Sequence, residues 1–243
     1  MIFKEERAGE GILFSALYSN NEEMIFNIKI QQQLTSEDLN YLQSKFEQLF
    51  NPLGKSATLL LQSIIFQYYQ ETHRTYHNLS HIYNLLKLSE QLDISNRLGF
   101  EIAIWYHDII YQPHFKDNEA QSAVLFLKDF DEHFLSTNFT DEENKRWINQ
   151  TILSTFGHQP RINNLDTKLF LDADLAILAA DTKTYEIYTK AIRTEYNIYP
   201  DHLYYQGRKQ VMTHFLERPK IYFTDTFEPF EQQARQNIIS EIS

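Results

Sequence analysis

The feature that most restricts the fold of this chain is the scarcity of residues that interrupt regular structure. Its 243 residues include only 6 glycines and 6 prolines. Between these breaks, apolar residues recur at helical spacing, as in the run Leu39, Leu42 and Phe46. Long periodic segments with few breaks are typical of a mostly helical protein. The sequence therefore predicts an all-α fold, organised as a helical bundle.

The first 33 residues differ from the rest. Two apolar runs, residues 12–18 and 24–30, flank a polar insert at residues 19–23. Alternating apolar runs around a polar turn indicate a β-hairpin, so residues 1–33 are predicted to form a small N-terminal extension. Such a hairpin could exchange strands between subunits, which would make the protein a homo-oligomer. The helical domain is predicted to occupy residues 34–243.

Several helix boundaries can be predicted from capping residues. Thr35 or Ser36 can cap the first helix, and the segment 51–54 (Asn-Pro-Leu-Gly) ends it. Ser80 is the expected cap of a later helix. The caps expected after that are Asp117 or Asn118 and then Asp141.

Charge and composition exclude several classes of partner. The formal net charge of −11 disfavours binding to nucleic-acid backbones or anionic membranes. It leaves room for a small phosphorylated molecule, because a bound dication changes the local field. The chain has no cysteine, which excludes thiolate chemistry, and its N-terminus does not resemble a signal peptide. No apolar run is long enough to span a bilayer, so a cytoplasmic protein is expected.

Four side chains from distant parts of the sequence suggest a metal site. His81 precedes His107 by 26 residues, and Asp174 follows Asp108 by 66. His107-Asp108 and Asp174 interrupt otherwise apolar segments, and buried carboxylates are costly unless they are paired or bound to metal. Facing helices of a bundle can bring such residues together. Imidazoles and carboxylates suit divalent Mn, Fe, Co, Ni or Zn.

The same residues carry a resemblance to a known family. His81, His107-Asp108 and Asp174 resemble the H…HD…D signature of the HD superfamily of metal-dependent phosphohydrolases. Residues 76–81 (Tyr-His-Asn-Leu-Ser-His) are similar to the first metal-binding segment of the distantly related cyclic-nucleotide phosphodiesterases. Over residues 35–240 the chain resembles a bacterial group of predicted HD phosphohydrolases. The resemblance implies an HD-domain-like bundle with His81, His107, Asp108 and Asp174 as metal ligands.

The resemblance implies a role for His77, and the chemistry and position of other residues suggest further roles. His77 occupies the position of a general acid, one helical turn before His81. Asp108 or Glu119 would orient the nucleophile, and Asp172 would cap a helix or support a ligand through a hydrogen bond. Where the phosphodiesterases have a further histidine, this chain has Ile109-Ile110-Tyr111, so one metal ion is favoured over two. The residues that could bind a second metal or the substrate phosphate are His114, His158, Arg193 and Lys209.

Three functions remain open at the level of sequence. The first is a hydrolase that cleaves a small phosphate ester, such as a nucleotide, by attack of a metal-activated water. The second is a di-iron oxygenase on the same scaffold, which needs extra histidines, and His114 and His158 are the evident suppliers. The third is a non-catalytic metal-binding helical module.

Overall fold

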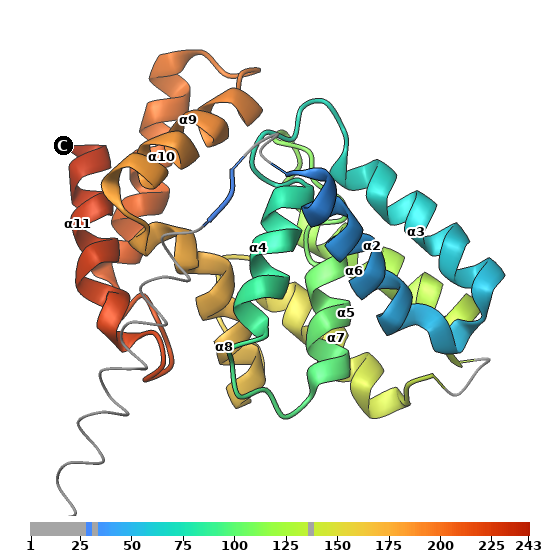
Figure 1. Ribbon diagram of the computed structural model, residues 1–243. Coiled ribbons are helices and arrows are strands. Elements are labelled where there is room, and N and C mark those ends of the chain that lie inside the picture. Colours follow the sequence, from blue (N-terminus) through green and yellow to red (C-terminus); the bar gives the residue numbers. More distant parts are fainter. Residues whose placement is uncertain (1–27, 31–33, 136–138) are drawn as a thin grey trace, which may run out of the picture.

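The computed structural model describes residues 28–30, 34–135 and 139–243, and these residues form helices and connecting segments without a β-strand. The all-α prediction is therefore confirmed for this part of the chain (Figure 1). The α-helices are α2 (Ser36–Phe50), α3 (Lys55–Tyr69), α4 (Leu79–Ser89), α5 (Arg97–Tyr106), α6 (Asn118–Asp129), α7 (Glu142–Ser154), α8 (Leu165–Asp174), α9 (Thr182–Glu195), α10 (Asp201–Glu217) and α11 (Glu231–Ile242). Shorter helical turns are η1 (Asn51–Leu53), the π-helical η2 (Phe130–Phe134), η4 (Leu175–Ala179) and η5 (Glu228–Phe230).

Helix boundaries mostly follow the predicted capping residues. Thr35 caps α2: its hydroxyl accepts from the Asp38 amide at 3.2 Å, while the Asp38 carboxylate accepts from the Thr35 amide at 2.8 Å. Gly54, with a φ of +86°, separates η1 from α3. The predicted cap of α4 was wrong by two residues. Asn78 is the cap, because its side-chain oxygen accepts from the amide of Ser80, which already belongs to the helix.

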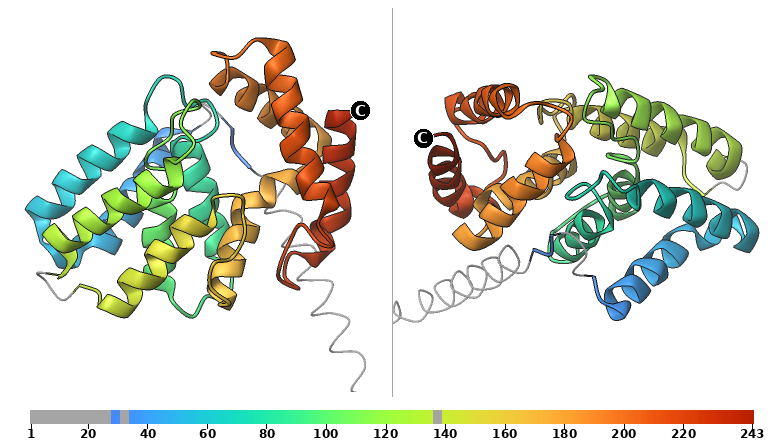
Figure 2. Two further views of the ribbon diagram at one scale, coloured as in Figure 1. Left: turned by 180° about the vertical axis from the view of Figure 1, so that it is seen from behind. Right: turned by 90° about the horizontal axis from the view of Figure 1, so that it is seen from above.

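Helix α5 lies at the centre of a group formed by α2 to α7. It packs against α2, α4, α6 and α7, and the two further views agree with this arrangement (Figure 2). Residues 102–106 of α5 are completely buried. A helix that is apolar on all sides is stable only when other helices surround it. His107 and Asp108 follow directly from this buried helix.

Helices α9, α10 and α11 form a second group, joined to the first through α8 and η4 (Figure 1). Helix α11 packs against both η4 and α10. The buried Asn237 of α11 donates to the carbonyls of Leu178 and Ala180, at 2.9 and 2.8 Å. These bonds fix the segment that follows Asp174. One continuous hydrophobic core extends from α2 to α11.

The predicted β-hairpin in residues 1–33 lies outside the described residues, except for residues 28–30, which form no strand. Residues 28–30 instead lie against α4. The Lys29 amide donates to the side-chain oxygen of Asn84 at 3.0 Å, and the Asn84 amide group donates to the Lys29 carbonyl at 2.7 Å.

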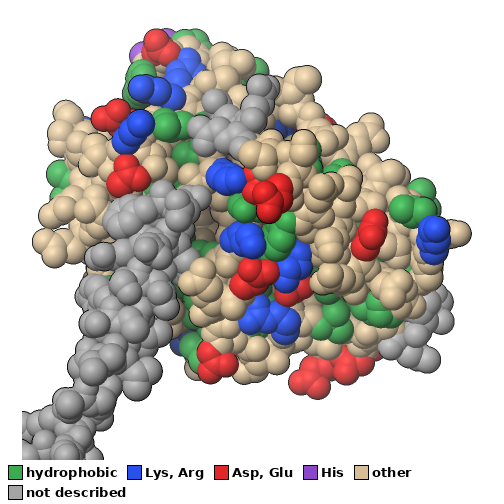
Figure 3. Space-filling model, viewed as in Figure 1, with side chains coloured by type: hydrophobic (Ala, Val, Ile, Leu, Met, Phe, Trp, Pro, Cys, Tyr) green, Lys and Arg blue, Asp and Glu red, His purple; other side chains and the backbone are tan. Residues whose placement is uncertain are grey.

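Opposite charges are intermixed on the face shown in Figure 3. Lys45 and Lys87 both pair with Glu90, at 2.8 and 3.5 Å, and Lys29 pairs with Asp38. Among the described residues of the chain, these basic side chains are therefore each paired with an acidic one. Within the described part of the chain, none of the helices has the length and apolar character that crossing a membrane requires.

Candidate metal centre

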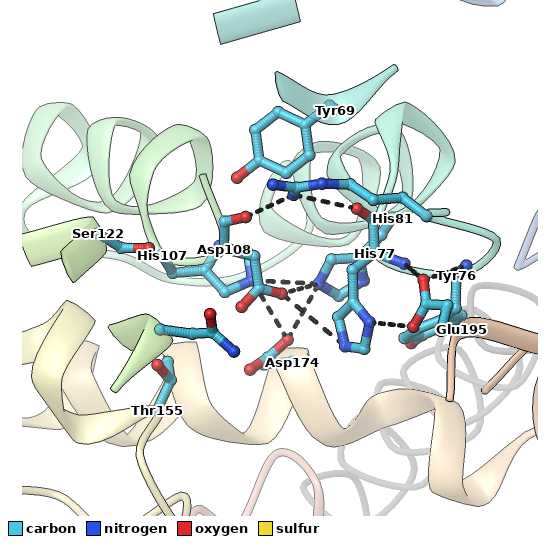
Figure 4. Close-up of polar contacts among 12 residues, drawn as sticks. Tyr69, Tyr76, His77, His81, His107, Asp108, Ser122, Thr155, Asp174 and Glu195 are labelled. Carbon is cyan, nitrogen blue, oxygen red and sulfur yellow. Dashed lines mark hydrogen bonds and ion pairs between the residues drawn. The ribbon is translucent and has the colours of Figure 1, made fainter. Parts of the chain in front are cut away.

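The four predicted ligands lie together in the structure (Figure 4). The Nε2 atoms of His81 and His107 are 3.1 Å apart. Asp174 Oδ1 lies 3.2 Å from His81 Nε2 and 3.6 Å from His107 Nε2. Asp108 Oδ2 lies 3.1 Å from His107 Nε2 and 3.8 Å from His81 Nε2. The ligand atoms of His81, His107 and Asp108 all lie within 4.8 Å of one another, and Asp174 approaches this group from the side of the two histidines. These side chains come from positions 81 to 174 of the sequence.

These distances fit the coordination shell of one transition-metal ion. Bonds of about 2.1 Å place adjacent ligands about 3.0 Å apart in an octahedron and about 3.4 Å apart in a tetrahedron. The separations of the two histidines from each other and from the two carboxylates lie between 3.1 and 3.8 Å, a range that includes the tetrahedral value and begins just above the octahedral one. Two imidazole nitrogens and two carboxylate oxygens also match the chemical preference of Mn, Fe, Co, Ni and Zn. The residues present therefore fit a divalent cation.

Local structure fixes the direction of each ligand. His81 lies in the first turn of α4, which the Asn78 cap holds in place. His107 is the C-cap of α5, and its Nδ1 lies 2.9 Å from the carbonyl of Ile104. That bond makes Nδ1 the protonated nitrogen and leaves Nε2 as the ligand atom. Asp174 is the last residue of α8.

Electrostatics within the cluster favour a bound positive charge. Burial by itself lowers the pKa of His107, but the charges of Asp108 and Asp174 outweigh burial and raise this pKa well above its usual value. Burial would raise the pKa of both carboxyls, and the charge of His107 lowers each of them instead. Burial lowers the pKa of His81, which stays neutral. A proton on His107 and a divalent cation would satisfy the same two carboxylates, so a metal ion bound there would displace this proton.

Arg74 stabilises the backbone next to the cluster, and sequence analysis did not identify it. The buried guanidinium donates to the carbonyls of Asp108 (2.6 Å), Ile109 (2.7 Å) and His77 (3.3 Å). It also pairs with Glu71 at 2.9 Å. Arg74 therefore joins the segment before α4, the helix that carries His81, to the segment after α5, which carries Asp108. Its partners near the site are backbone carbonyls, which leave no signal in the sequence.

His77 lies beside the cluster and is held by Glu195 of α9. His77 precedes the cap of α4, so the prediction that it shares a helix face with His81 was wrong, although their rings are 5.9 Å apart. Its Nδ1 lies 2.7 Å from Glu195 Oε2, and its Nε2 lies 4.0 Å from Asp108 Oδ2. Burial lowers the pKa of His77, but Glu195 outweighs burial and raises it. Glu195 also accepts from the amides of Tyr76 and His77, at 2.7 and 2.8 Å.

Two more of the predicted residues, Glu119 and His158, lie near the cluster. Both line the same cavity as His77, Asp108 and Asp174. Burial raises the pKa of Glu119, which lies in the first turn of α6. His158 Nε2 lies 3.1 Å from Asp174 Oδ2, and the backbone of His158 has a φ of +48°, a strained value for histidine. Arg218 donates to the His158 carbonyl at 3.0 Å and stabilises this turn.

The remaining predicted residues are not brought to the cluster. Asp172 accepts from the Phe223 and Thr224 amides at 2.7 and 2.8 Å, and thus anchors the segment before α11 instead of supporting a ligand or capping a helix. Arg193 pairs with Asp201 at 2.6 Å. Lys209 donates to the carbonyl of Ile242 at 2.9 Å, and the ring of His114 contacts that of Phe115. Asp172, Arg193, Lys209 and His114 are all outside the described lining of the cavity.

A cavity of about 890 Å³ opens from the cluster toward α9 and α10. Asp108 and Asp174 line it together with Glu119 of α6, residues 155–158 and side chains of η4, α9 and α10. This volume is in the usual range for a small-molecule site.

Comparisons with protein-family models, with curated proteins and with solved structures found no match to this chain. The function therefore has to be inferred from the site itself.

Proposed function

We propose that this protein is a metal-dependent phosphohydrolase with an HD-domain-like bundle, acting on a small phosphate ester. The observation that carries the proposal is the proximity of His81, His107, Asp108 and Asp174 beside a cavity of substrate size, which the two aspartates line. A divalent cation bound by these residues supplies Lewis-acid polarisation of a phosphoryl oxygen and lowers the pKa of a water molecule. Hydrolysis adds that water to phosphorus, breaks the ester P–O bond and releases an alcohol and phosphate.

His77 is suited to protonate the departing alcohol oxygen. Its Nδ1 is bound to Glu195, so Nε2 is the nitrogen that faces the cluster and Asp108. The carboxylate of Glu195 stabilises the protonated imidazole, which is the form a general acid needs. Leu79 begins α4 two residues later, so the short segment before the helix, and not the helix itself, positions this proton donor.

Glu119 is the candidate to accept the proton of the attacking water. Burial raises the pKa of Glu119, and a raised pKa makes a carboxylate a better base near neutral pH. Asp108 is bound to His107 through Oδ2, so its role is to hold the ligand set and orient the water.

Metal analysis and hydrolysis assays on matched variants test the proposal. The purified protein should contain about one divalent ion per chain, and it should hydrolyse at least one member of a phosphomonoester, phosphodiester and nucleotide panel. His107→Ala should lose both the metal and the activity, because an imidazole ligand is removed. His202→Ala, which removes an exposed histidine of α10, is the control and should keep both. A metal-loaded protein that hydrolyses none of the panel would contradict the proposal.

A second candidate function is a di-iron oxygenase, and one contact favours it. His158 Nε2 lies 3.1 Å from Asp174 Oδ2, so a further histidine is present next to the cluster. Close to two iron ions per chain, and a spectral change on exposure to O₂, would identify this activity. One ion per chain that remains bound in the His158→Ala variant would argue against it. Metal binding without either reaction would indicate the non-catalytic module.

A further inference from the structure

Aromatic side chains extend from the cluster into the cavity. The Tyr111 ring stacks on His77 with 4.1 Å between the centroids. Tyr76 contacts His77 at 4.9 Å and Tyr188 at 4.8 Å. The cavity lining also includes Tyr196, Tyr199 and Tyr204. The centroid of the Tyr196 ring lies 6.2 Å from that of Tyr199 and 6.1 Å from that of Tyr204. We call these six tyrosines the aromatic wall. Such a wall binds planar rings through stacking and edge contacts.

The cationic side chains in the described lining of the cavity already have partners. Arg208 is bound to Glu241 at 2.8 Å and to the Tyr188 hydroxyl at 3.1 Å. Arg218 donates to the carbonyls of Gly157 and His158. Binding sites for polyphosphates need several free cationic groups to offset the charge. This cavity therefore suits a ligand with a single phosphate, which the cation of the cluster would neutralise.

Gly207 leaves open space in the middle of the α10 wall. It lies on the helix face that Tyr204 and Val211 also share, and all three line the cavity. A Cβ added at Gly207 would meet no atom within 4 Å. Glycine inside a helix reduces helix stability relative to alanine, so its presence here needs a reason. Space for a ligand between the side chains of Tyr204 and Val211 provides such a reason.

Taken with the proposed hydrolase activity, on which this inference rests, the cavity defines a class of substrate. We propose that the substrate is a monophosphate ester whose alcohol carries a planar aromatic ring, bound between the aromatic wall and Gly207. The phosphate lies at the cluster and His77 faces the ester oxygen. The ring lies toward α9 and α10. Inorganic polyphosphates and esters of small alkyl alcohols lack the features that this cavity recognises.

A comparison of three substrates on the metal-loaded protein tests the inference. The probes are 2-phenylethyl phosphate, ethyl phosphate and inorganic tripolyphosphate. Burial of the ring predicts that kcat/KM for the phenylethyl ester exceeds that for the ethyl ester by about 10- to 100-fold. Tripolyphosphate should be hydrolysed no faster than the ethyl ester. Equal kcat/KM for the two esters, or preferred hydrolysis of tripolyphosphate, would overturn the inference.

Variants of α10 locate the ring. Gly207→Leu fills the open space and should reduce the phenylethyl-to-ethyl ratio of kcat/KM by about tenfold. Gly207→Ala should reduce it less while raising the unfolding temperature, which separates loss of space from loss of folding. Gln206→Leu is the matched control, because Gln206 is exposed and outside the described cavity lining, and it should leave the ratio unchanged. An unchanged ratio in Gly207→Leu would place the ring elsewhere.

Binding measurements separate this inference from the proposed function. Calorimetry with 2-phenylethylphosphonate and ethylphosphonate, which cannot be hydrolysed at a P–O ester bond, reports ring recognition without turnover. A ring preference of about tenfold or more in wild type, lost in Gly207→Leu, supports the inference even if no ester is cleaved, and only the hydrolase proposal then fails. Equal affinity for the two phosphonates overturns the substrate class even if hydrolysis is observed.

Discussion

Some residues around the cluster position the candidate metal ligands, and others stabilise the protonated form of His77. Glu195 belongs to the second group. It is buried, it accepts from two backbone amides, and its other oxygen binds His77 Nδ1. These bonds go to Tyr76 and His77, which are not candidate metal ligands, so loss of Glu195 should affect proton transfer and not metal binding.

Glu195→Gln tests this separation. The amide oxygen can still accept from the backbone, but a neutral group no longer stabilises the protonated His77. We expect kcat to fall about 100-fold while metal affinity stays within about twofold. Steady-state kinetics and metal titration measure the two effects. Glu186→Gln, an exposed change on the same helix, should alter neither value. Loss of metal in Glu195→Gln would show that Glu195 positions the ligands instead.

The candidate ligand set was predicted from the family resemblance together with the setting of histidines and aspartates within apolar segments. The same reasoning could not identify Glu195 as the partner of His77, since 118 positions separate them. It selected Arg193 and Lys209 for their charge, yet Arg193 pairs with Asp201 and Lys209 binds a carbonyl of α11. The sequence shows that a residue is charged, but it does not show which group will pair with that charge in the folded protein.

At the scale of elements, Arg74 connects α4 and α5 near their ligand-bearing ends. Arg74→Lys keeps the charge but cannot reach three carbonyls and Glu71 together. We expect a loss of stability of about 2 kcal/mol and a metal affinity about 10- to 100-fold lower. Urea unfolding and calorimetric metal titration measure these two quantities.

Arg97→Lys provides the matched control for Arg74. Arg97 donates to the carbonyls of Ser89 and Leu92, at the end of α4 away from the cluster. Its replacement should lower stability while leaving metal affinity unchanged. If the two variants weaken metal binding equally, the effect comes from general destabilisation and Arg74 has no specific role.

The start of α2 gives a prediction for pH dependence. Burial would raise the pKa of Asp38, but bonds from Lys29 and Thr35 outweigh burial and hold this pKa far below its usual value. A carboxyl with a lowered folded pKa stabilises the protein above its unfolded pKa of about 3.9 and loses this contribution as pH falls toward the folded value. Asp38→Asn should therefore cost about 1 kcal/mol at pH 7, and less as the pH falls from 5 to 2.

Urea unfolding at several pH values measures this difference. Glu37→Gln, which changes an exposed acid in the same turn, is the control and should show a smaller and less pH-dependent effect. A difference between wild type and Asp38→Asn that stays constant down to pH 2 would mean that the Asp38 carboxylate is not stabilised in the folded state.

At the scale of the whole molecule, the four candidate ligands connect α4, α5 and α8. A cation bound there would connect helices from distant parts of the chain, so it should raise the free energy of unfolding of the whole protein. At a free metal concentration 100 times Kd, the gain is about 2.7 kcal/mol, which corresponds to an unfolding temperature about 5 to 10 °C higher. Differential scanning calorimetry with Mn, Fe, Co, Ni and Zn measures the shift.

Asp174→Asn should abolish most of this thermal shift, since it removes the anionic ligand supplied by α8. His202→Ala should retain it. No shift with any of the five metals would contradict a divalent cation site and would leave the cluster as a set of buried ion pairs.

The sequence by itself determined the helical class, most helix boundaries and the residues able to bind a cation. These properties depend on short-range patterns: apolar periodicity, capping side chains such as Thr35, and the chemistry of imidazole and carboxylate. Only the tertiary structure decided what Asp172 binds. Asp174 lies beside the histidines, whereas Asp172, two residues earlier on α8, binds the segment before α11. Packing of α9 against η4 and of α10 against α11 also decided that a tyrosine-lined cavity adjoins the site, because its walls come from segments far apart in the chain.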